Sequence, residues 1–130
     1  MNLKQEIIDF ILDADAKALA TYSNTDINVV PVSMIRVVEN KIWLANFFMN
    51  KTEQNLKANP KASLVCWKGV AGYQIKSSVA YSTHGEAFEE AKKWIAEKAP
   101  HRILKGLLIL DPTAVFDVAP FKEKAGIQIE

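Results

Sequence analysis

Apolar and polar residues alternate through much of the chain, which is the pattern of half-buried β-strands. The longest alternation covers residues 73–84. Branched and aromatic residues predict further strands, namely 18–22, 27–38, 41–46, 61–68, 106–110 and 113–118. Pro31 lies inside the second of these, and proline cannot donate a ladder hydrogen bond. That strand is therefore expected at a sheet edge, at a bulge or beside a ligand.

Three other segments have the apolar spacing or the composition of helices. They are residues 7–12, 51–58 and 86–99. About six strands with few helices predict a mainly β fold, a closed or partly closed antiparallel barrel with flanking helices. The 130 residues should form one domain over 1–130. The tail from Pro120 is expected either to cross onto another chain or to fray.

The charge balance and the single cysteine exclude several classes of function. Sixteen basic and fifteen acidic residues give a net charge of +1, so no broad field favours nucleic acid or an anionic membrane. Cys66 is the only cysteine, which excludes an internal disulfide and a multi-cysteine metal site. No stretch approaches the ~20 apolar residues that span a bilayer, so a cytoplasmic location is expected.

A lysine and a threonine lie where a strand is expected to end and a helix to begin. Asn50 is predicted to be the N-cap, with Glu53 reaching back to its amide as in a capping box. The free amides of the first turn, together with Lys51 and Thr52, would then favour an anion such as phosphate. The plain alternative is that Lys51 and Thr52 are solvated surface residues without a ligand.

Other residues with potential chemistry have plainer interpretations. Phe47-Phe48-Met49 is an apolar loop that should be covered by a ligand or a partner, or else pack at the base of the loop. Cys66 is expected to be a small buried hydrophobe. His84 and His101 are expected to be structural or exposed, and no metal site is predicted.

The order of these motifs resembles the pyridoxamine 5'-phosphate oxidase-like, FMN-binding split barrels. A first helix is followed by strands that contain Val29-Val30-Pro31-Val32-Ser33, and then by Asn50-Lys51-Thr52 with Asn55-Leu56. The resemblance covers nearly the whole chain, and residues 51–56 are its most specific part. It implies a six-stranded antiparallel split barrel that binds FMN between the two protomers of a homodimer.

The resemblance also implies which residues hold the cofactor. The phosphate would lie near Lys51 and Thr52, with Asn55 close by. Val32 and Ser33 would lie along the flavin and its ribityl chain, with backbone groups near Pro31 facing the cofactor and Gln74 bordering the ring. The implied FMN-binding residues are Val32, Ser33, Ala45, Asn46, Phe47, Lys51, Thr52, Asn55 and Gln74.

Three functions are compatible with this assignment. The first is an FMN-dependent oxidoreductase that acts on an unidentified small molecule, with the flavin supplying the hydride chemistry. The second is an FMN-binding electron carrier without a substrate of its own. The third is a haem-binding barrel, in which His84 or His101 would be the axial ligand. Residues 125–130 lack the arginine-containing ending of true pyridoxamine phosphate oxidases, so vitamin B6 oxidation is not expected. No sequence feature specifies a catalytic residue, a substrate or an electron donor.

Overall fold

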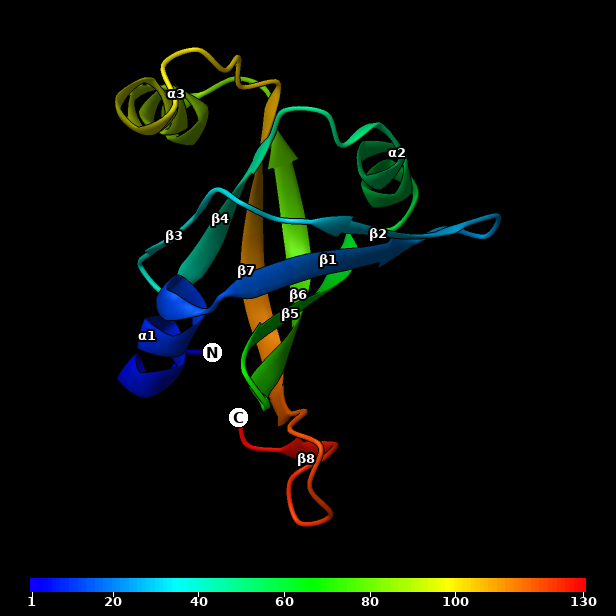
Figure 1. Ribbon diagram of the computed structural model, residues 1–130. Helices are drawn as coiled ribbons and strands as arrows, with labels where there is room; N and C mark the ends of the chain where they lie inside the picture. The colour runs from blue at the N-terminus through cyan, green and yellow to red at the C-terminus, as the bar shows by residue number, and fades with distance from the viewer.

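The computed structural model describes all 130 residues as three helices and eight strands (Figure 1). The helices are α1 Gln5–Asp13, α2 Asn50–Ala58 and α3 Glu86–Lys98. The strands are β1 Ala16–Tyr22, β2 Ile27–Pro31, β3 Ile35–Val38, β4 Lys41–Asn46, β5 Lys61–Lys68, β6 Ala71–Ser82, β7 Gly106–Asp117 and β8 Ile127–Gln128.

All strand pairs are antiparallel, and the sheet has the order β2-β1-β5-β6-β7-β4-β3, with β8 added to β7. Strands β2 and β3 form the two ends of this path, although only residues 32–34 separate them in sequence. The sheet therefore curls until its ends come near each other without pairing, which is a split barrel. The predicted class, a mainly β antiparallel barrel with helices, is confirmed.

The strands differ from the predicted segments in two places, and β8 is an additional short strand. Residues 27–38 form two strands because Pro31 ends β2 and residues 32–34 leave the sheet. Pro31 lies on β2, the edge strand, and pairs with Ala18 of β1, so its predicted edge position is confirmed. Residues 106–117 form one long strand, in which Pro112 lies beside a register shift between Lys76 and Ser77 of β6. The bulge lets proline remain in the strand.

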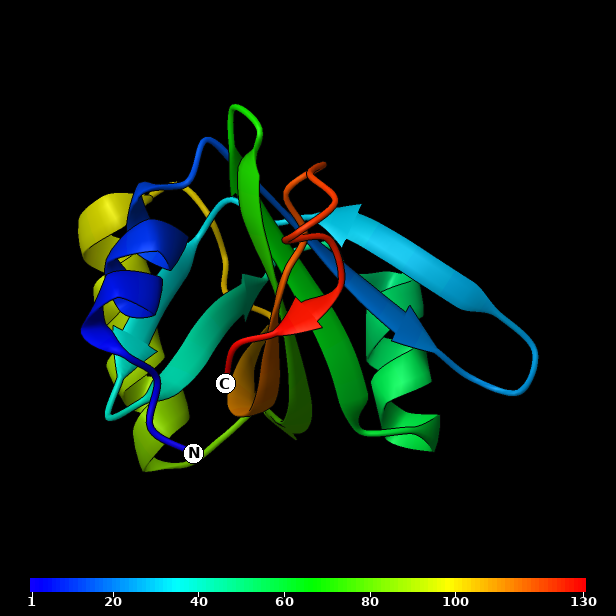
Figure 2. The same ribbon diagram turned by 90° about the horizontal axis from the view of Figure 1, so that it is seen from below.

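The main core lies between the sheet and α1 (Figure 2). Ile7 and Ile11, one turn apart on α1, are completely or almost completely buried. They pack with apolar side chains from the inner face of the strands, including Leu64, Ile75 and Leu108. Cys66 belongs to the same core, and burial raises the pKa of its thiol to about 11, so the predicted buried hydrophobe is confirmed.

A second, smaller core joins α3 to β4 and β7. Trp43 and Trp94 are buried there, and the Arg36 guanidinium lies 5.4 Å from one ring centroid and 5.5 Å from the other. Both tryptophans are therefore packing residues with cation–π contacts. Trp67 differs, since it is 40% exposed.

The C-terminal tail folds back onto its own chain. Strand β8 pairs with the end of β7, and the Glu130 carboxylate accepts a hydrogen bond of 3.1 Å from the Lys4 amide. Figure 1 shows the two termini close together. The tail is therefore not frayed, because the edge of β7 offers it a hydrogen-bonding partner, and its crossing onto another chain stays a prediction.

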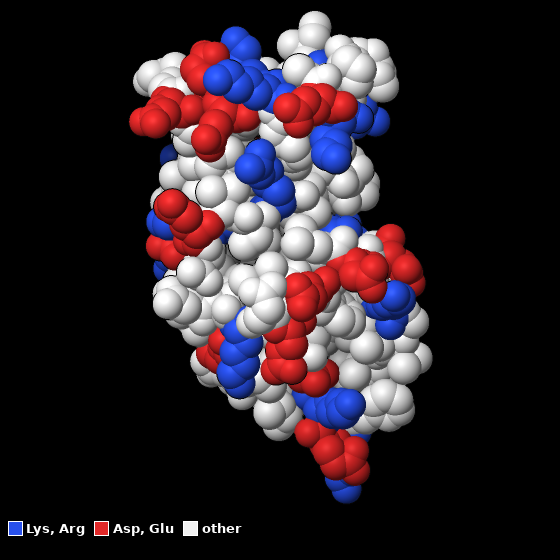
Figure 3. All heavy atoms as spheres, turned by 90° about the vertical axis from the view of Figure 1, so that its left-hand side faces the viewer, with Lys and Arg blue, Asp and Glu red and all other residues white.

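None of the three helices combines the length and the apolar content that crossing a bilayer needs. On the face shown in Figure 3, lysines and arginines are interspersed with acidic side chains. No strongly charged patch of one sign covers that face.

Candidate functional site

Asn46 fixes the turn that leads from β4 into α2. Its side chain is fully buried. The Asn46 Oδ1 accepts a hydrogen bond of 2.7 Å from the Met49 amide, and its Nδ2 donates one of 2.7 Å to the Tyr81 hydroxyl. Burial raises the pKa of Tyr81, so its hydroxyl stays protonated over an extended pH range. The turn is thus held in place by side chains from β4 and β6, the two strands that flank β7.

The predicted capping box at the start of α2 is wrong. Asn50 is the first helical residue, Met49 has the cap position, and no side chain caps the helix. The Asn50 Oδ1 instead accepts a hydrogen bond of 2.9 Å from Lys105 Nζ, which also lies 3.2 Å from the Glu53 carboxylate. The backbone already satisfies the two donors of the predicted capping box, because the Glu53 amide donates to the Met49 carbonyl at 2.9 Å and the Asn50 amide donates to the Phe48 carbonyl at 3.0 Å.

The start of α2 presents an anion site made of backbone and one side chain. The amides of Lys51 and Thr52 donate to no acceptor within the protein. The Lys51 side chain is exposed and has no carboxylate partner. Two free amides, the positive end of the helix dipole and a free ammonium group can together bind a phosphate or a carboxylate.

Thr52 and Asn55 tie α2 to the β1–β2 hairpin. Thr52 is completely buried, and its hydroxyl accepts a 3.0 Å hydrogen bond from Asn28 Nδ2. Asn55 is also buried and donates to the Thr21 hydroxyl at 3.2 Å. These bonds place the anion site beside the edge strand β2. A direct contact of either side chain with a ligand stays a prediction.

The structure brings the predicted residues of β4 and of the 32–34 segment together. The Ala45 amide donates to the Met34 carbonyl at 3.4 Å, which holds the segment against the end of β4. Val32 and Ala45 are buried, whereas Ser33 is exposed. The segment therefore borders the same turn as Asn46, on the side where the barrel is split.

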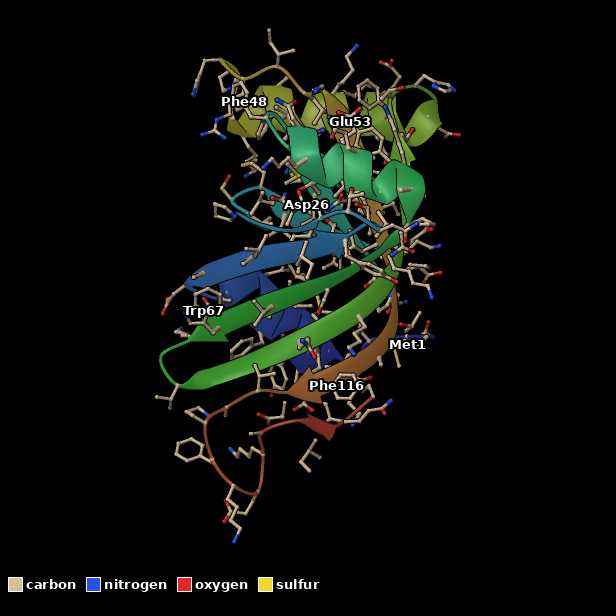
Figure 4. The ribbon with its side chains drawn as sticks, turned by 90° about the vertical axis from the view of Figure 1, so that its right-hand side faces the viewer. Met1, Asp26, Phe48, Glu53, Trp67 and Phe116 are labelled. Carbon is tan, nitrogen blue, oxygen red and sulfur yellow. The ribbon has the colours of Figure 1, made fainter.

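The apolar loop before α2 divides into two environments. Phe47 is half-buried against the second core, with the Arg102 guanidinium 4.9 Å from its ring centroid. Met49 packs against the main core. Phe48 is 87% exposed (Figure 4), so it is the one apolar side chain of this loop that the protein leaves uncovered.

Gln74 is the predicted residue that the single chain does not bring to this site. It lies on β6 opposite Val65, seven residues from Tyr81. At about 3.3 Å per residue, roughly 23 Å of extended strand separates it from the Asn46 contact. Only a second copy of the chain could bring a Gln74 side chain to the start of α2.

His84 and His101 are both exposed and lie just beyond opposite ends of α3. No three histidine, cysteine or acidic side chains gather in a metal-binding arrangement. The two imidazoles therefore cannot act on one small ligand from this single chain.

Five residues that hold the site in place have no signal in the sequence. These are Thr21, Asn28, Tyr81, Arg102 and Lys105. Each lies more than twenty residues from its partner, so no local spacing signals the contact. Only the strand register could have identified them, because Tyr81 and Gly106 come beside Asn46 through the β4–β7–β6 pairing.

The Lys105–Glu53 contact predicts a modest pH effect on stability. The Lys105 ammonium holds the pKa of Glu53 below its ordinary value of 4.5. A lowered folded-state pKa stabilises the protein above 4.5, and that contribution is lost as the pH falls through the folded value. Glu53→Gln should therefore lower the free energy of unfolding by less than about 1 kcal/mol at neutral pH, since the contact is partly exposed.

Urea unfolding at neutral pH and near pH 3 measures this effect, and the difference from the parent protein should shrink at the lower pH. Glu97→Gln is the control, because Glu97 is exposed and has no ion pair. A Glu53→Gln deficit that stays the same at both pH values would contradict the assignment.

Comparisons with known proteins agree with this architecture. The sequence profile of the family described as pyridoxamine 5'-phosphate oxidase matches residues 3–120. No curated protein shows significant sequence similarity to the chain.

Solved structures share the fold at low sequence identity. HupZ of Group A Streptococcus superposes with a TM-score of 0.82 and 21% identity, over 96% of this chain and 98% of its own. An FMN-binding protein of Syntrophomonas wolfei superposes with a TM-score of 0.77 and 19% identity, over 91% of this chain and 90% of its own. HutZ, the heme storage protein of Vibrio cholerae, superposes with a TM-score of 0.68 and 16% identity, over 89% of this chain and 94% of its own. At such identities the likeness shows a common fold.

Proposed function

Because the chain belongs to the pyridoxamine 5'-phosphate oxidase family, as its resemblance predicted, we propose that it is an FMN-binding flavoprotein. The observation that carries this proposal is the start of α2, where the free amides of Lys51 and Thr52 lie beside the exposed Lys51 ammonium. FMN differs from most aromatic ligands by its dianionic phosphate, which matches that set of donors. The similar Syntrophomonas protein is itself FMN-binding.

The neighbouring residues fit the rest of the cofactor. The 32–34 segment and the end of β4 lie side by side next to α2, and they offer backbone groups and the small side chains of Ser33 and Ala45. The exposed Phe48 ring belongs to the same turn. These residues would bind and orient the flavin, and the flavin would supply hydride or electron transfer.

A homodimer would complete the site, because one sheet face is apolar and uncovered. Ile27 and Val29 on β2 are 83% and 65% exposed, and both point to the outer face of the sheet together with Tyr22 and Trp67. Figure 4 looks onto β1, β5 and β6 with α1 behind them. A second copy is the simplest cover for such a face.

The position of Gln74 supports the same arrangement. Gln74 lies on the outer face in one row with Val65 and Phe116. Docking of two outer faces would carry the Gln74 of one protomer toward the α2 site of the other. The flavin would then lie between protomers, and the barrel would act on a small-molecule substrate or exchange electrons with a donor in the cytoplasm.

A haem-binding barrel is the second candidate. The structural likeness to the heme storage protein of Vibrio cholerae favours it. Haem carries two carboxylates, which could also use the Lys51 site, but no contact directs an imidazole to the start of α2: His84 and His101 are exposed on the loops at the two ends of α3, His101 next to Arg102, which contacts Phe47. The α2 site therefore fits FMN better.

Titration of the purified protein with FMN tests the proposal. We expect bound flavin, seen as a shifted absorbance band and quenched fluorescence, and a rise in the unfolding temperature. Saturation at one hundred times Kd should add about 2.7 kcal/mol to the stability. Parallel titration with haemin is the comparison. A protein that takes up haemin with a Soret band, and neither binds FMN nor is stabilised by it, would contradict the flavin assignment.

A further inference from the structure

An acidic side chain lies beside the anion site at the start of α2. Glu53 is in the first turn of the helix (Figure 4), one residue after Thr52, and its side chain is only 16% exposed. An acidic residue at this position stabilises the helix through the helix dipole. The same carboxylate repels a phosphate on the free amides of Lys51 and Thr52, because both anions use the positive end of one helix. A phosphate can bind tightly here only if a cation offsets Glu53.

Lys105, from the segment that precedes β7, places a cation at this point. Its Nζ lies 3.2 Å from the Glu53 carboxylate and donates a hydrogen bond of 2.9 Å to the Asn50 Oδ1. Asn50 and Glu53 are three positions apart, so they are neighbours on one side of the helix. A single ammonium group therefore contacts both the first helical residue and the acid of the first turn.

The backbone fixes the position of Lys105. Its amide donates to the Asn46 carbonyl at 2.9 Å, and the next residue, Gly106, pairs with Asn46 between β4 and β7. The Asn46 side chain also fixes the turn before α2, through the Met49 amide. The backbone of Lys105 is thus held without Glu53, so its ammonium group stays within reach of the helix when the carboxylate is removed.

The two other lysines of α2 have different surroundings. Lys57 pairs with Glu53 at 3.5 Å, but it belongs to the last turn and its side chain is 69% exposed, so water screens its charge. Lys51 is exposed and has no carboxylate partner. Lys51 is therefore free to contact a phosphate directly, whereas Lys105 is the cation that Glu53 and Asn50 hold.

We propose that Lys105 is a positioning residue of the cofactor site, which offsets the Glu53 carboxylate so that a dianionic phosphate can bind to the first turn of α2. The inference rests on the proposed FMN site. It separates stability from binding at Glu53. Loss of this carboxylate removes a stabilising contact, but it also removes a repulsion and leaves Lys105 free to attract the phosphate.

Fluorescence titration of four proteins with FMN and with riboflavin tests the proposal. The proteins are the parent, Lys105→Gln, Glu53→Gln and the double variant. Lys105→Gln should weaken FMN binding about tenfold and change riboflavin binding less than about twofold, because only FMN carries the phosphate. Glu53→Gln should bind FMN at least as tightly as the parent, although it is less stable. The double variant should recover FMN affinity to within about threefold of the parent.

Lys93→Gln is the control for the loss of one positive charge. Lys93 is an exposed lysine of α3 without an ion pair, so its removal should change neither affinity. A residue that only supports the fold would lower both affinities together, and removal of its partner would not restore them. The ratio of FMN to riboflavin affinity and its recovery in the double variant therefore report the role of the charge.

Three results would overturn the proposal. Equal losses of FMN and riboflavin affinity in Lys105→Gln would show a purely structural role. A loss of FMN affinity that Glu53→Gln does not recover would show that Lys105 contacts the phosphate directly. Unchanged FMN affinity in Lys105→Gln would show that the Glu53 charge does not act on the site. A parent protein that binds no FMN refutes the proposed function and this inference with it, whereas any of the three results with a parent that binds FMN refutes this inference alone.

Discussion

Lys51→Ala should weaken FMN binding by about 10- to 100-fold and leave riboflavin binding almost unchanged. A hydrogen bond to a charged group contributes about 1.5–3 kcal/mol, which corresponds to that range. Only FMN carries the phosphate that the Lys51 ammonium would contact. Thr52 is left intact in this test because its hydroxyl already bonds Asn28, so its removal would also loosen the helix. Fluorescence titration of apoprotein with both ligands measures the difference.

Lys57→Ala is the matched control for this variant. Lys57 lies on the same helix but in its last turn, where it pairs with Glu53 at 3.5 Å. Its removal should alter FMN affinity little, because the phosphate belongs at the opposite end of the helix. Equal losses of FMN and riboflavin affinity in Lys51→Ala would place the phosphate elsewhere.

The local parts of the site were predictable from the sequence, and the contacts that hold them were not. A strand, a turn and a helix around residues 41–58 follow from residue types alone, and the structure has β4 and α2 there. The capping box failed because the Glu53 and Asn50 amides donate to the backbone carbonyls of Met49 and Phe48 instead. A local motif cannot show that a backbone carbonyl has satisfied its donors first.

The long-range contacts depend on strand register. Lys105 comes directly before β7. Because β7 pairs with β4, Lys105 lies beside the start of α2 and reaches Asn50. No spacing in the chain encodes that pairing, since the two residues are 55 positions apart. The predicted strand over 27–38 failed for a related reason. Its branched residues suit a strand throughout, but the split of the barrel requires the chain to leave the sheet after Pro31.

Gly106→Ala should destabilise the protein by about 2–5 kcal/mol, from overpacking and from the loss of a buried hydrogen bond. A Cβ atom at Gly106 would overlap the hydroxyl and the ring carbon Cζ of Tyr81. Tyr81 cannot retreat without breaking its 2.7 Å hydrogen bond with Asn46. Because Asn46 also holds the Met49 amide at 2.7 Å, the start of α2 should move as well, and FMN affinity should fall with stability.

A double-mutant cycle separates this clash from any effect of alanine in the strand. In a Tyr81→Ala background the overlapping atoms are gone, so adding Gly106→Ala should cost less than about 0.5 kcal/mol or even stabilise the strand. Urea unfolding of the four proteins gives the coupling free energy. A cost of Gly106→Ala that is the same in both backgrounds would show that Tyr81 is not the obstacle. Strong coupling, in contrast, would show that the register of β6 against β7 controls the turn at which the cofactor phosphate is proposed to bind.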